Sequence, residues 1–253
     1  MGNLKVRDLT QSFPREDGSE LTVLDHLNLD VKDKEFVCIL GSSGCGKTTL
    51  LRLIAGLDTA RAGTIFLDGG EMRGPSAKVG FVFQEYSLFP WRSVIDNIVF
   101  GLEMKGIPKE ERYRIAERYL ELVNLTQFRT NYPSELSGGM RQRVAVARAL
   151  TLDPVLLLMD EPFGALDAQT RNMLQTELLE IWEKTKKTII FITHSVDEAV
   201  FLSDRIVVLT PRPGRICQVV PIDLPRPRDR TSTEFAQVRR HILDLINQKC
   251  SIQ

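Results

Sequence analysis

One eight-residue stretch constrains this 253-residue chain more than any other feature. Residues 41–48 read GSSGCGKT and complete the pattern G-x-x-x-x-G-K-[ST]. The apolar run EFVCIL (35–40) precedes the loop, and a helical pattern over 47–55, closed by Gly56, follows it. Glycines in such a loop let the backbone curl until several N–H groups face phosphate oxygens. The strand, loop and helix together therefore predict a phosphate-binding loop rather than a Gly-rich turn that binds nothing.

The side chains of this loop fit a nucleotide with its metal ion. Lys47 can place its charge between the β- and γ-phosphates, and the Thr48 hydroxyl is a hard oxygen ligand suited to Mg²⁺. The helix that follows adds the positive end of its dipole. We expect the bound ATP to contact Gly41, Ser42, Ser43, Gly44, Cys45, Gly46, Lys47, Thr48 and Thr49.

A second motif ends an apolar strand with two carboxylates. VLLLMDE (155–161) delivers Asp160 and Glu161 at the carboxyl end of the strand, where α/β folds place their chemistry. Asp160 is suited to hold Mg²⁺ through water. Glu161 is expected to point to the opposite side, because neighbours on a strand alternate, and so to act as general base toward water.

The periodicity of the chain predicts an α/β fold with a mainly parallel sheet. Alternation over residues 4–40 indicates antiparallel strands, and the pattern from 91 to 150 is mainly helical. Further strands are predicted at 63–69, 78–83, 154–160, 188–193 and 205–210, and helices at 93–104, 108–123, 138–151, 167–187, 196–203 and 231–248. PRPGR (211–215) is expected to form a turn, and PRPRDR (225–230) a surface connection.

Composition excludes several classes of protein. With 33 basic and 33 acidic residues the net charge is zero, which argues against nucleic-acid binding. No run approaches 18 apolar residues, and the N-terminus lacks the apolar core of a signal peptide. The four cysteines, at 38, 45, 217 and 250, have neither metal nor disulfide spacing. The simplest expectation is four reduced thiols in a cytoplasmic setting.

The segment LSGGMRQR (136–143) predicts a second anion site. Ser137 can cap a helix that begins at Gly138, and Gly138 and Gly139 allow a phosphate close to bare amides. Here the chain resembles the ABC-transporter ATPases, although Met140 stands where glutamine is commonest in their signature. The resemblance implies that this site meets the phosphate loop of a second chain, in a head-to-tail dimer with two composite ATP sites.

Other motifs follow in the order of that family. By resemblance, Gln84 in VFQEY senses Mg²⁺ and water, Asp167 in FGALD contacts the dimer partner, and His194 in FITHS contacts the γ-phosphate. Phe13 stands where the family places an aromatic ring that stacks on adenine, although a core position is the alternative. Catalytic roles are thus implied for Glu161, His194, Gln84 and Lys47, and Mg²⁺ contacts for Thr48, Gln84 and Asp160.

The resemblance covers residues 4–230 and implies a P-loop NTPase fold. We expect an ABC-type ATPase domain at 1–230, with an N-terminal antiparallel β subdomain and an inserted α-helical subdomain at about 91–150. A C-terminal helix and tail are expected at 231–253.

Longer segments of the sequence, such as VFQEYSLFPWRSVIDNIVFGLE and DLPRPRD, resemble the ATPases of the nitrate, sulfonate and taurine importers. This resemblance implies a peripheral ATPase at the cytoplasmic face of the inner membrane, powering import of a small oxyanion or organosulfur compound. The expected partners are a second ATPase chain (identical or a close paralogue), membrane permease subunits and, indirectly, a solute-binding protein. Residues 87–91, SLFPW, are expected to receive the permease rather than only to pack locally. Another small organic solute, or export, is the alternative.

Three rival classes fit less well. A chromosome-maintenance ATPase would carry a long coiled coil between its phosphate loop and LSGG, whereas about ninety residues without heptads separate them here. A translation-factor ATPase would hold two such domains in one chain. A nucleotide-binding module without catalysis would be expected to lack Glu161 or His194, and both are present.

Overall fold

The computed structural model describes residues 1–250, without the side chains of Gln248 and Lys249. The last part of the predicted tail, residues 251–253, lies outside the described residues. The chain divides into two compact units. The first unit combines residues 1–76 with the chain from 188 onward, and the second comprises residues 77–187.

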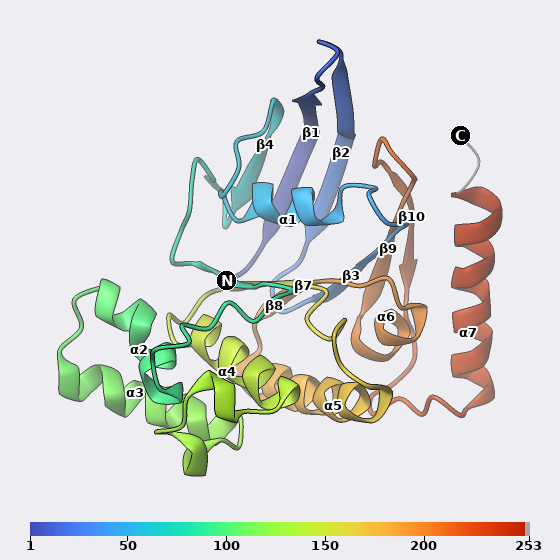
Figure 1. The fold of residues 1–253 in the computed structure, drawn as a ribbon. Helices are drawn as coiled ribbons and strands as arrows, with labels where there is room; N and C mark the ends of the chain where they lie inside the picture. The colour runs from blue at the N-terminus through green and yellow to red at the C-terminus, as the bar shows by residue number, and fades with distance from the viewer. Residues whose placement is uncertain (251–253) are drawn as a thin grey trace. The chain divides into compact units, whose positions relative to one another are not determined.

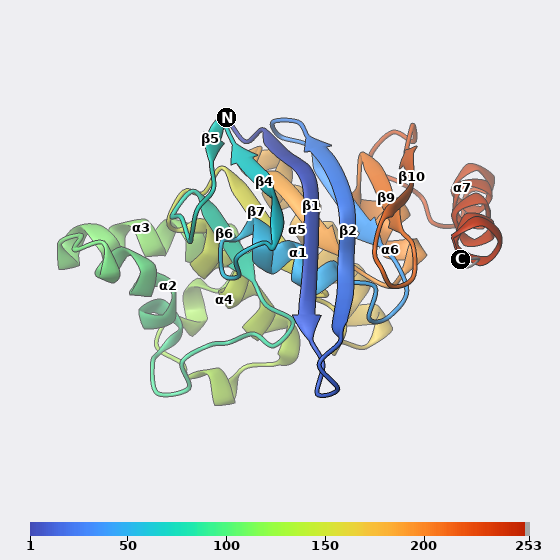
Figure 2. The same ribbon diagram turned by 90° about the horizontal axis from the view of Figure 1, so that it is seen from above.

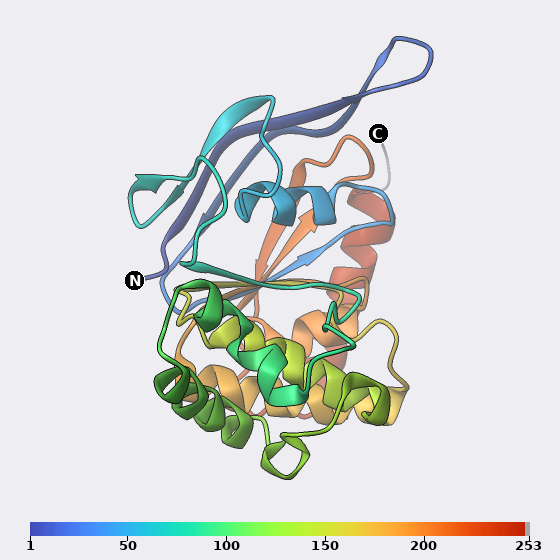
Figure 3. The same ribbon diagram turned by 60° about the vertical axis from the view of Figure 1, so that its left-hand side comes forward.

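The first unit contains the predicted antiparallel sheet (Figure 2), with strand order β2-β1-β4-β5. Its strands are β1 (Leu4–Pro14), β2 (Glu20–Val31), β4 (Ala62–Leu67) and β5 (Gly70–Glu71). Leu4 pairs with Val31 on one side and with Leu67 on the other. All three side chains are buried, as expected for one apolar face. Figure 3 shows the long hairpin that β1 and β2 form.

A second set of strands in this unit runs in the order β10-β9-β3-β8. β3 (Phe36–Leu40) is parallel to β8 (Thr188–Ile192) and β9 (Arg205–Leu209), and all of its residues are buried. This pairing agrees with the predicted mainly parallel sheet, whereas the antiparallel expectation for residues 4–40 is wrong for β3. β10 (Ile216–Pro221), which the pattern did not predict, is antiparallel to β9. Since β3, β8 and β9 are parallel, their carboxyl ends lie at one edge, from which the chain enters α1 (Lys47–Ile54) and α6 (Val196–Leu202).

The C-terminal part of the unit corrects one expectation. α7 (Thr233–Asp244) and a π-helical turn (Leu245–Lys249) correspond to the predicted final helix and pack beside α6 (Figure 1). Cys217 of β10 forms a disulfide with Cys250. The expectation of four unpaired thiols is therefore wrong for this pair. The two cysteines are 33 residues apart, and only the return of α7 past β10 brings them together.

The Pro- and Arg-rich connection between β10 and α7 also differs from the prediction. Arg228 is only 7% exposed, so a surface connection is wrong for this residue. Its guanidinium donates to the carbonyls of Val200 and Ser203, at the end of α6, at 2.5 and 2.7 Å. Arg226 pairs with Asp204 at 2.6 Å. The connection thus closes the end of α6 with two arginines.

The second unit contains a parallel strand pair and most of the helices. β6 (Val79–Val82) pairs with β7 (Leu156–Asp160), with Val82 opposite Met159. The helices are α2 (Val94–Met104), α3 (Lys109–Leu122), α4 (Gly138–Leu150) and α5 (Ala168–Thr185), with short 3₁₀ turns at Thr126–Phe128 and Pro133–Glu135. Each helix begins and ends within two residues of its predicted bounds.

Candidate nucleotide-binding site

The phosphate loop joins the carboxyl end of β3 to the first turn of α1. Gly44 and Gly46 have φ values of 76° and 100°, in the left-handed region that glycine adopts without strain. Gly46 is the N-cap of α1, and no side chain there accepts from the first amides of the helix. The backbone amides of this helix end are therefore suited to an anion.

Lys47 lies over the loop that it follows. Its side chain is bent so that Nζ donates to the carbonyls of Gly41 and Ser42, at 2.9 and 3.1 Å, and the residue is only 6% exposed. Ser42, Ser43 and Thr48 are exposed. The loop thus presents hydroxyl groups to solvent beside an ammonium group.

Cys45 directly precedes Gly46, the N-cap of α1, and a helix N-terminus favours the thiolate of a nearby cysteine. The residue is fully buried, and its Sγ lies 2.6 Å from the position that a Cβ on Gly41 would take. Burial raises the pKa of the Cys45 thiol, and this effect outweighs the opposing charge of Lys47. Desolvation therefore outweighs the helix N-terminus at this position.

Two more expected site residues belong to the first unit. Phe13, on β1, is 40% exposed, so its ring is not part of the core. His194 is exposed and directly follows Thr193 at the end of β8. Because β8 is the parallel neighbour of β3, His194 lies at the same strand edge as the phosphate loop. Thr193 bonds to Glu198 of α6 through its hydroxyl, which anchors the chain beside His194.

The second unit places its expected catalytic residues at the end of its strand pair. Asp160 is the buried last residue of β7. Glu161 follows with φ 42° and is half-buried. A left-handed turn, and not the alternation of strand neighbours, therefore separates the two carboxylates. Gln84 is exposed two residues beyond β6, the parallel partner of β7, and so lies at the same strand edge.

The signature segment begins α4. The Ser137 hydroxyl accepts from the Met140 amide at 3.3 Å, which confirms the predicted cap. A Cβ on Gly138 would lie 2.9 Å from a methyl group of Leu166 and 3.1 Å from the Tyr86 hydroxyl. Glycine is therefore needed for the helix start to lie this close to both side chains.

Asp167 has a local role that the sequence reasoning missed. Its carboxylate caps α5 by accepting from the amides of Gln169 and Thr170, at 3.1 and 3.0 Å. These hydrogen bonds, that to Thr170 first, lower the pKa of Asp167. An aspartate directly before a helical pattern is a typical N-cap signal and could have shown this role.

The segment after Gln84 is held by two residues of the second unit that we did not single out from the sequence. Asn97 is fully buried, accepts from the Phe89 amide at 2.8 Å, and donates to the carbonyls of Phe89, Arg92 and Ser93. Arg148 of α4 donates to the carbonyls of Tyr86 and Ser87, at 3.2 and 2.7 Å.

Trp91 is 72% exposed, whereas Leu88 and Phe89 are half-buried. Local packing therefore accounts for part of segment 87–91 and leaves its indole uncovered.

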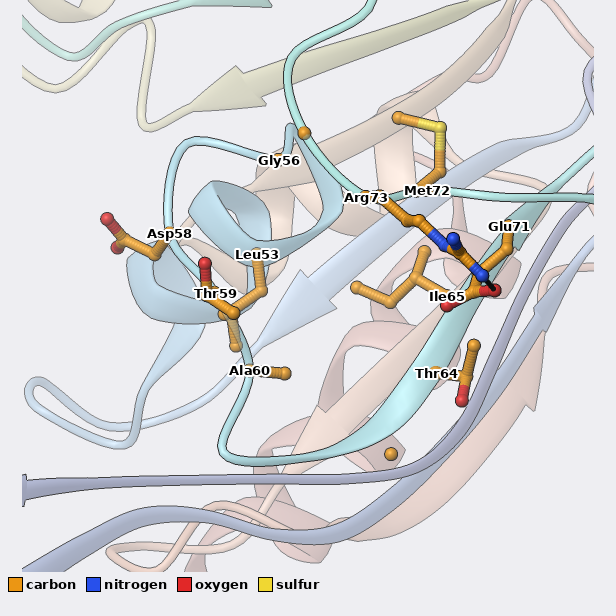
Figure 4. Close-up of a pocket in the computed structure, with 12 residues that line it drawn as sticks. Leu53, Gly56, Asp58, Thr59, Ala60, Thr64, Ile65, Glu71, Met72 and Arg73 are labelled. Carbon is orange, nitrogen blue, oxygen red and sulfur yellow. Dashed lines mark hydrogen bonds and ion pairs between the residues drawn. The ribbon is translucent and has the colours of Figure 1, made fainter.

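A cavity of about 230 Å³ lies elsewhere in the first unit, beside the last turn of α1 (Figure 4). Leu53 and Gly56 line it on one side, and an ion pair between Arg73 and Glu71 lies on the other. Because the phosphate loop is at the opposite end of α1, this cavity is separate from the candidate site. Among residues 1–250, no group of three or more His, Cys, Asp or Glu side chains could hold a metal ion by itself.

Comparison with known proteins decides the family. Residues 24–164 match the family model described as ABC transporter. The chain belongs to the ABC transporter family. An uncharacterized ABC transporter ATP-binding protein of Methanocaldococcus jannaschii is 58% identical over 97% of this chain and 92% of its own length.

Two further ABC transporter relatives have names that state a role. The nitrate import ATP-binding protein NrtD of Synechocystis is 49% identical over 94% of this chain and 89% of its own. The aliphatic sulfonates import ATP-binding protein SsuB of Bacillus cereus is 46% identical over 95% and 94%. A solved ATP-binding cassette, a dimer with ADP and Pi in a post-hydrolysis state, is 30% identical and has a TM-score of 0.76. That alignment covers 88% of this chain and all of the other.

These ABC transporter relatives are ATP-binding subunits, and this chain is accordingly an ABC-type ATPase. The solved cassette supports the P-loop NTPase fold expected from the sequence. No helix among residues 1–250 combines the length and apolar character needed to cross a membrane.

Proposed function

We propose that this ATPase powers an importer for a small oxyanion or organosulfur compound, from the cytoplasmic face of the cell membrane. The observation that carries the ATPase role is the phosphate loop between β3 and α1, with its uncapped helix start and the bent Lys47. The nitrate and sulfonate importers among the relatives support the solute class. Another small organic solute, or an exporter, is the alternative.

ATP binding uses residues of the first unit. The Lys47 ammonium exchanges its bonds to the Gly41 and Ser42 carbonyls for oxygens of the β- and γ-phosphates, while loop amides bind the remaining oxygens. The exposed ring of Phe13 is free of the core and stacks on adenine. His194, at the same strand edge as the loop, donates a hydrogen bond to the γ-phosphate.

Mg²⁺ fits the oxygen donors of three expected ligands. The hydroxyl of Thr48, the amide of Gln84 and the carboxylate of Asp160 are hard oxygen ligands of the kind that Mg²⁺ prefers. Thr48 and Gln84 are both exposed, so neither residue is enclosed by the protein. When bound, Mg²⁺ supplies positive charge that offsets the charge of the phosphates.

Hydrolysis transfers the γ-phosphoryl group of ATP to water, with ADP as the leaving group. Glu161 accepts the proton as water attacks phosphorus, and the bond to the ADP oxygen breaks, which leaves ADP and inorganic phosphate. The turn at Glu161 separates its carboxylate from Asp160, so that one group serves the metal and the other the water.

Two copies of the chain, or this chain and a close paralogue, complete each site. The capped start of α4, with Ser137, Gly138 and Gly139, offers backbone amides to the γ-phosphate held by the other chain. Asp167 contacts the partner chain near the same place. The dimeric cassette that holds ADP and Pi supports this arrangement by similarity.

Movement reaches the membrane through segment 87–91. We propose that Trp91 inserts between residues of a permease subunit, because its ring is exposed while Asn97 and Arg148 hold the backbone around it. Trp91→Ala should abolish stimulation of ATPase activity by the membrane subunits and keep basal activity within about twofold. Leu243→Ala, at an exposed leucine of α7, is the control and should leave stimulation intact. Unchanged stimulation in Trp91→Ala contradicts this docking role.

The solute class is tested apart from the ATPase. A deletion strain should fail to grow on nitrate, taurine or an alkanesulfonate as sole source of nitrogen or sulfur, and the partner solute-binding protein should bind the same compound. Unimpaired use of all three overturns the oxyanion and organosulfur assignment. A purified chain that hydrolyses no ATP, with or without its permease, overturns the ATPase role instead.

A further inference from the structure

The turn between β9 and β10, residues 210–215, is built against the phosphate loop. A Cβ on Gly214 would lie 2.2 Å from the Cys45 carbonyl, so the two backbones are in close contact. Gly214 donates to the Val23 carbonyl at 2.8 Å and accepts from the Asp25 amide at 3.2 Å. Figures 1 and 2 show the orange turn beside the pale blue loop that precedes α1. The turn therefore has a fixed place next to the nucleotide site.

The turn is also held by bonds of its own. The Thr210 hydroxyl donates to the Pro213 carbonyl at 2.8 Å and accepts from the Arg215 amide at 2.9 Å. Arg215 forms an ion pair with Asp25 of β2. Together with the Gly214 bonds, these contacts hold the turn without any contribution from the Arg212 side chain.

Arg212 contacts the phosphate loop directly. Its side chain is exposed, yet Nε and Nη2 both donate to the Gly44 carbonyl, at 3.0 and 2.9 Å. Gly44 is in the middle of the loop, in the left-handed conformation. Because the peptide unit is planar and trans, fixing this carbonyl also fixes the direction of the Cys45 N–H on the opposite side. That N–H donates to the Ser42 carbonyl within the loop at 3.3 Å, a long bond that a phosphate oxygen can replace.

We infer that Arg212 is a positioning residue for nucleotide binding, which holds the Gly44–Cys45 peptide with its N–H toward the phosphates and adds a positive charge beside them. Burial raises the pKa of the Cys45 thiol, and the charges of Lys47 and, to a smaller extent, Arg212 oppose this rise. Because the peptide plane is already fixed, the amide can exchange its bond to Ser42 for a phosphate oxygen with little reorientation, so the expected consequence is tighter binding of MgATP. The rate of the chemical step should not depend on Arg212, because its guanidinium is bonded to a loop carbonyl.

The test compares Arg212→Gln with Arg215→Gln in the full-length chain. Arg215 has the same charge and is exposed on the same turn, but it pairs with Asp25 instead of the loop. Arg212→Gln should raise the Kd of a fluorescent ATP analogue and the KM for MgATP about tenfold, with kcat within about twofold of wild type. Arg212→Lys keeps the positive charge but loses the paired Nε and Nη2 donors, and should raise Kd and KM by less than Arg212→Gln does.

The control Arg215→Gln should leave Kd and KM within about twofold of wild type. If the Kd and KM of Arg212→Gln are also within about twofold of wild type, the inference is overturned. An equal rise in both variants overturns it as well, since the turn as a whole would then be responsible. A fall in kcat with an unchanged KM would make Arg212 a part of the chemical step and contradict the positioning role.

Discussion

Replacing the buried arginine at the end of α6 tests whether the Pro- and Arg-rich connection is structural. Arg228 makes five hydrogen bonds, and every acceptor is a backbone carbonyl, from Val200, Phe201, Ser203, Ile222 and Leu224. Burial lowers the pKa of Arg228 to about 10, so the guanidinium remains charged at neutral pH. Arg228→Met keeps an apolar stem, removes all five donors and leaves the carbonyls at the end of α6 without them.

The cost follows from the burial and the number of bonds. Truncating one member of a buried charged network costs about 3–5 kcal/mol, because partners stay buried without a hydrogen bond. For a chain of this length, 1 kcal/mol shifts the melting temperature by about 2–4 °C, so Arg228→Met should melt about 10 °C below wild type. Arg228→Lys should lose most of this stability too, because a single ammonium group cannot reach the separate acceptors of Nε, Nη1 and Nη2.

The assay is thermal unfolding followed by circular dichroism, together with amide hydrogen exchange across residues 196–203. Faster exchange at the end of α6 is expected in Arg228→Met. Arg239→Met is the matched control, because Arg239 is exposed on α7, and it should change stability by less than about 0.5 kcal/mol. If Arg228→Met is within about 1 kcal/mol of wild type, the hydrogen bonds of Arg228 do not stabilise this end of α6.

Three further predictions concern the phosphate loop and the disulfide. Lys47→Ala should reduce ATP hydrolysis at least about 100-fold, since it removes charge from the β- and γ-phosphates, and normal turnover would contradict the loop assignment. Alkylation of Cys45, followed by mass spectrometry, should be slower in the presence of MgATP. Because burial raises the pKa of this thiol, the rate of alkylation should still be rising with pH at 9.0, the ordinary pKa. A rate that reaches a plateau below pH 9.0 would contradict the raised pKa. Cys217 and Cys250 lie 33 residues apart, and reducing their disulfide should lower the free energy of unfolding by about 3 kcal/mol. The stability of Cys217→Ser should not change on addition of reductant. An equal loss of stability in both proteins would contradict a stabilising disulfide.

Local patterns predicted most of the fold. The strand-loop-helix arrangement around Lys47, the cap at Ser137 and the bounds of the long helices depend on residues close together in the sequence, and periodicity is sufficient to find them. The buried strands were equally clear, since a strand covered on both faces, such as β7, is a continuous apolar run.

The features that were missed depend on residues far apart in the sequence. β10 was not predicted because its residues are only partly buried and its pairing with β9 follows a tight turn. The bond from Arg212 to Gly44 spans 168 residues, and no local spacing indicates it. The burial of Arg228 depends on α6 ending beside the connection. A sequence rich in proline and arginine is usually exposed, so composition indicated the opposite environment.

The central claim is that this chain hydrolyses ATP in a dimer with Glu161 as the general base. Glu161→Gln tests it most directly, because the amide keeps the size of the side chain but cannot accept the proton of the attacking water. The measurement follows ATP turnover and molecular mass by light scattering in the same sample. The account predicts that the variant binds MgATP, forms a stable dimer in its presence and hydrolyses it at least about 100-fold more slowly than wild type. Hydrolysis at the wild-type rate would contradict the role of Glu161, and a chain that stays monomeric with MgATP bound would contradict the composite site.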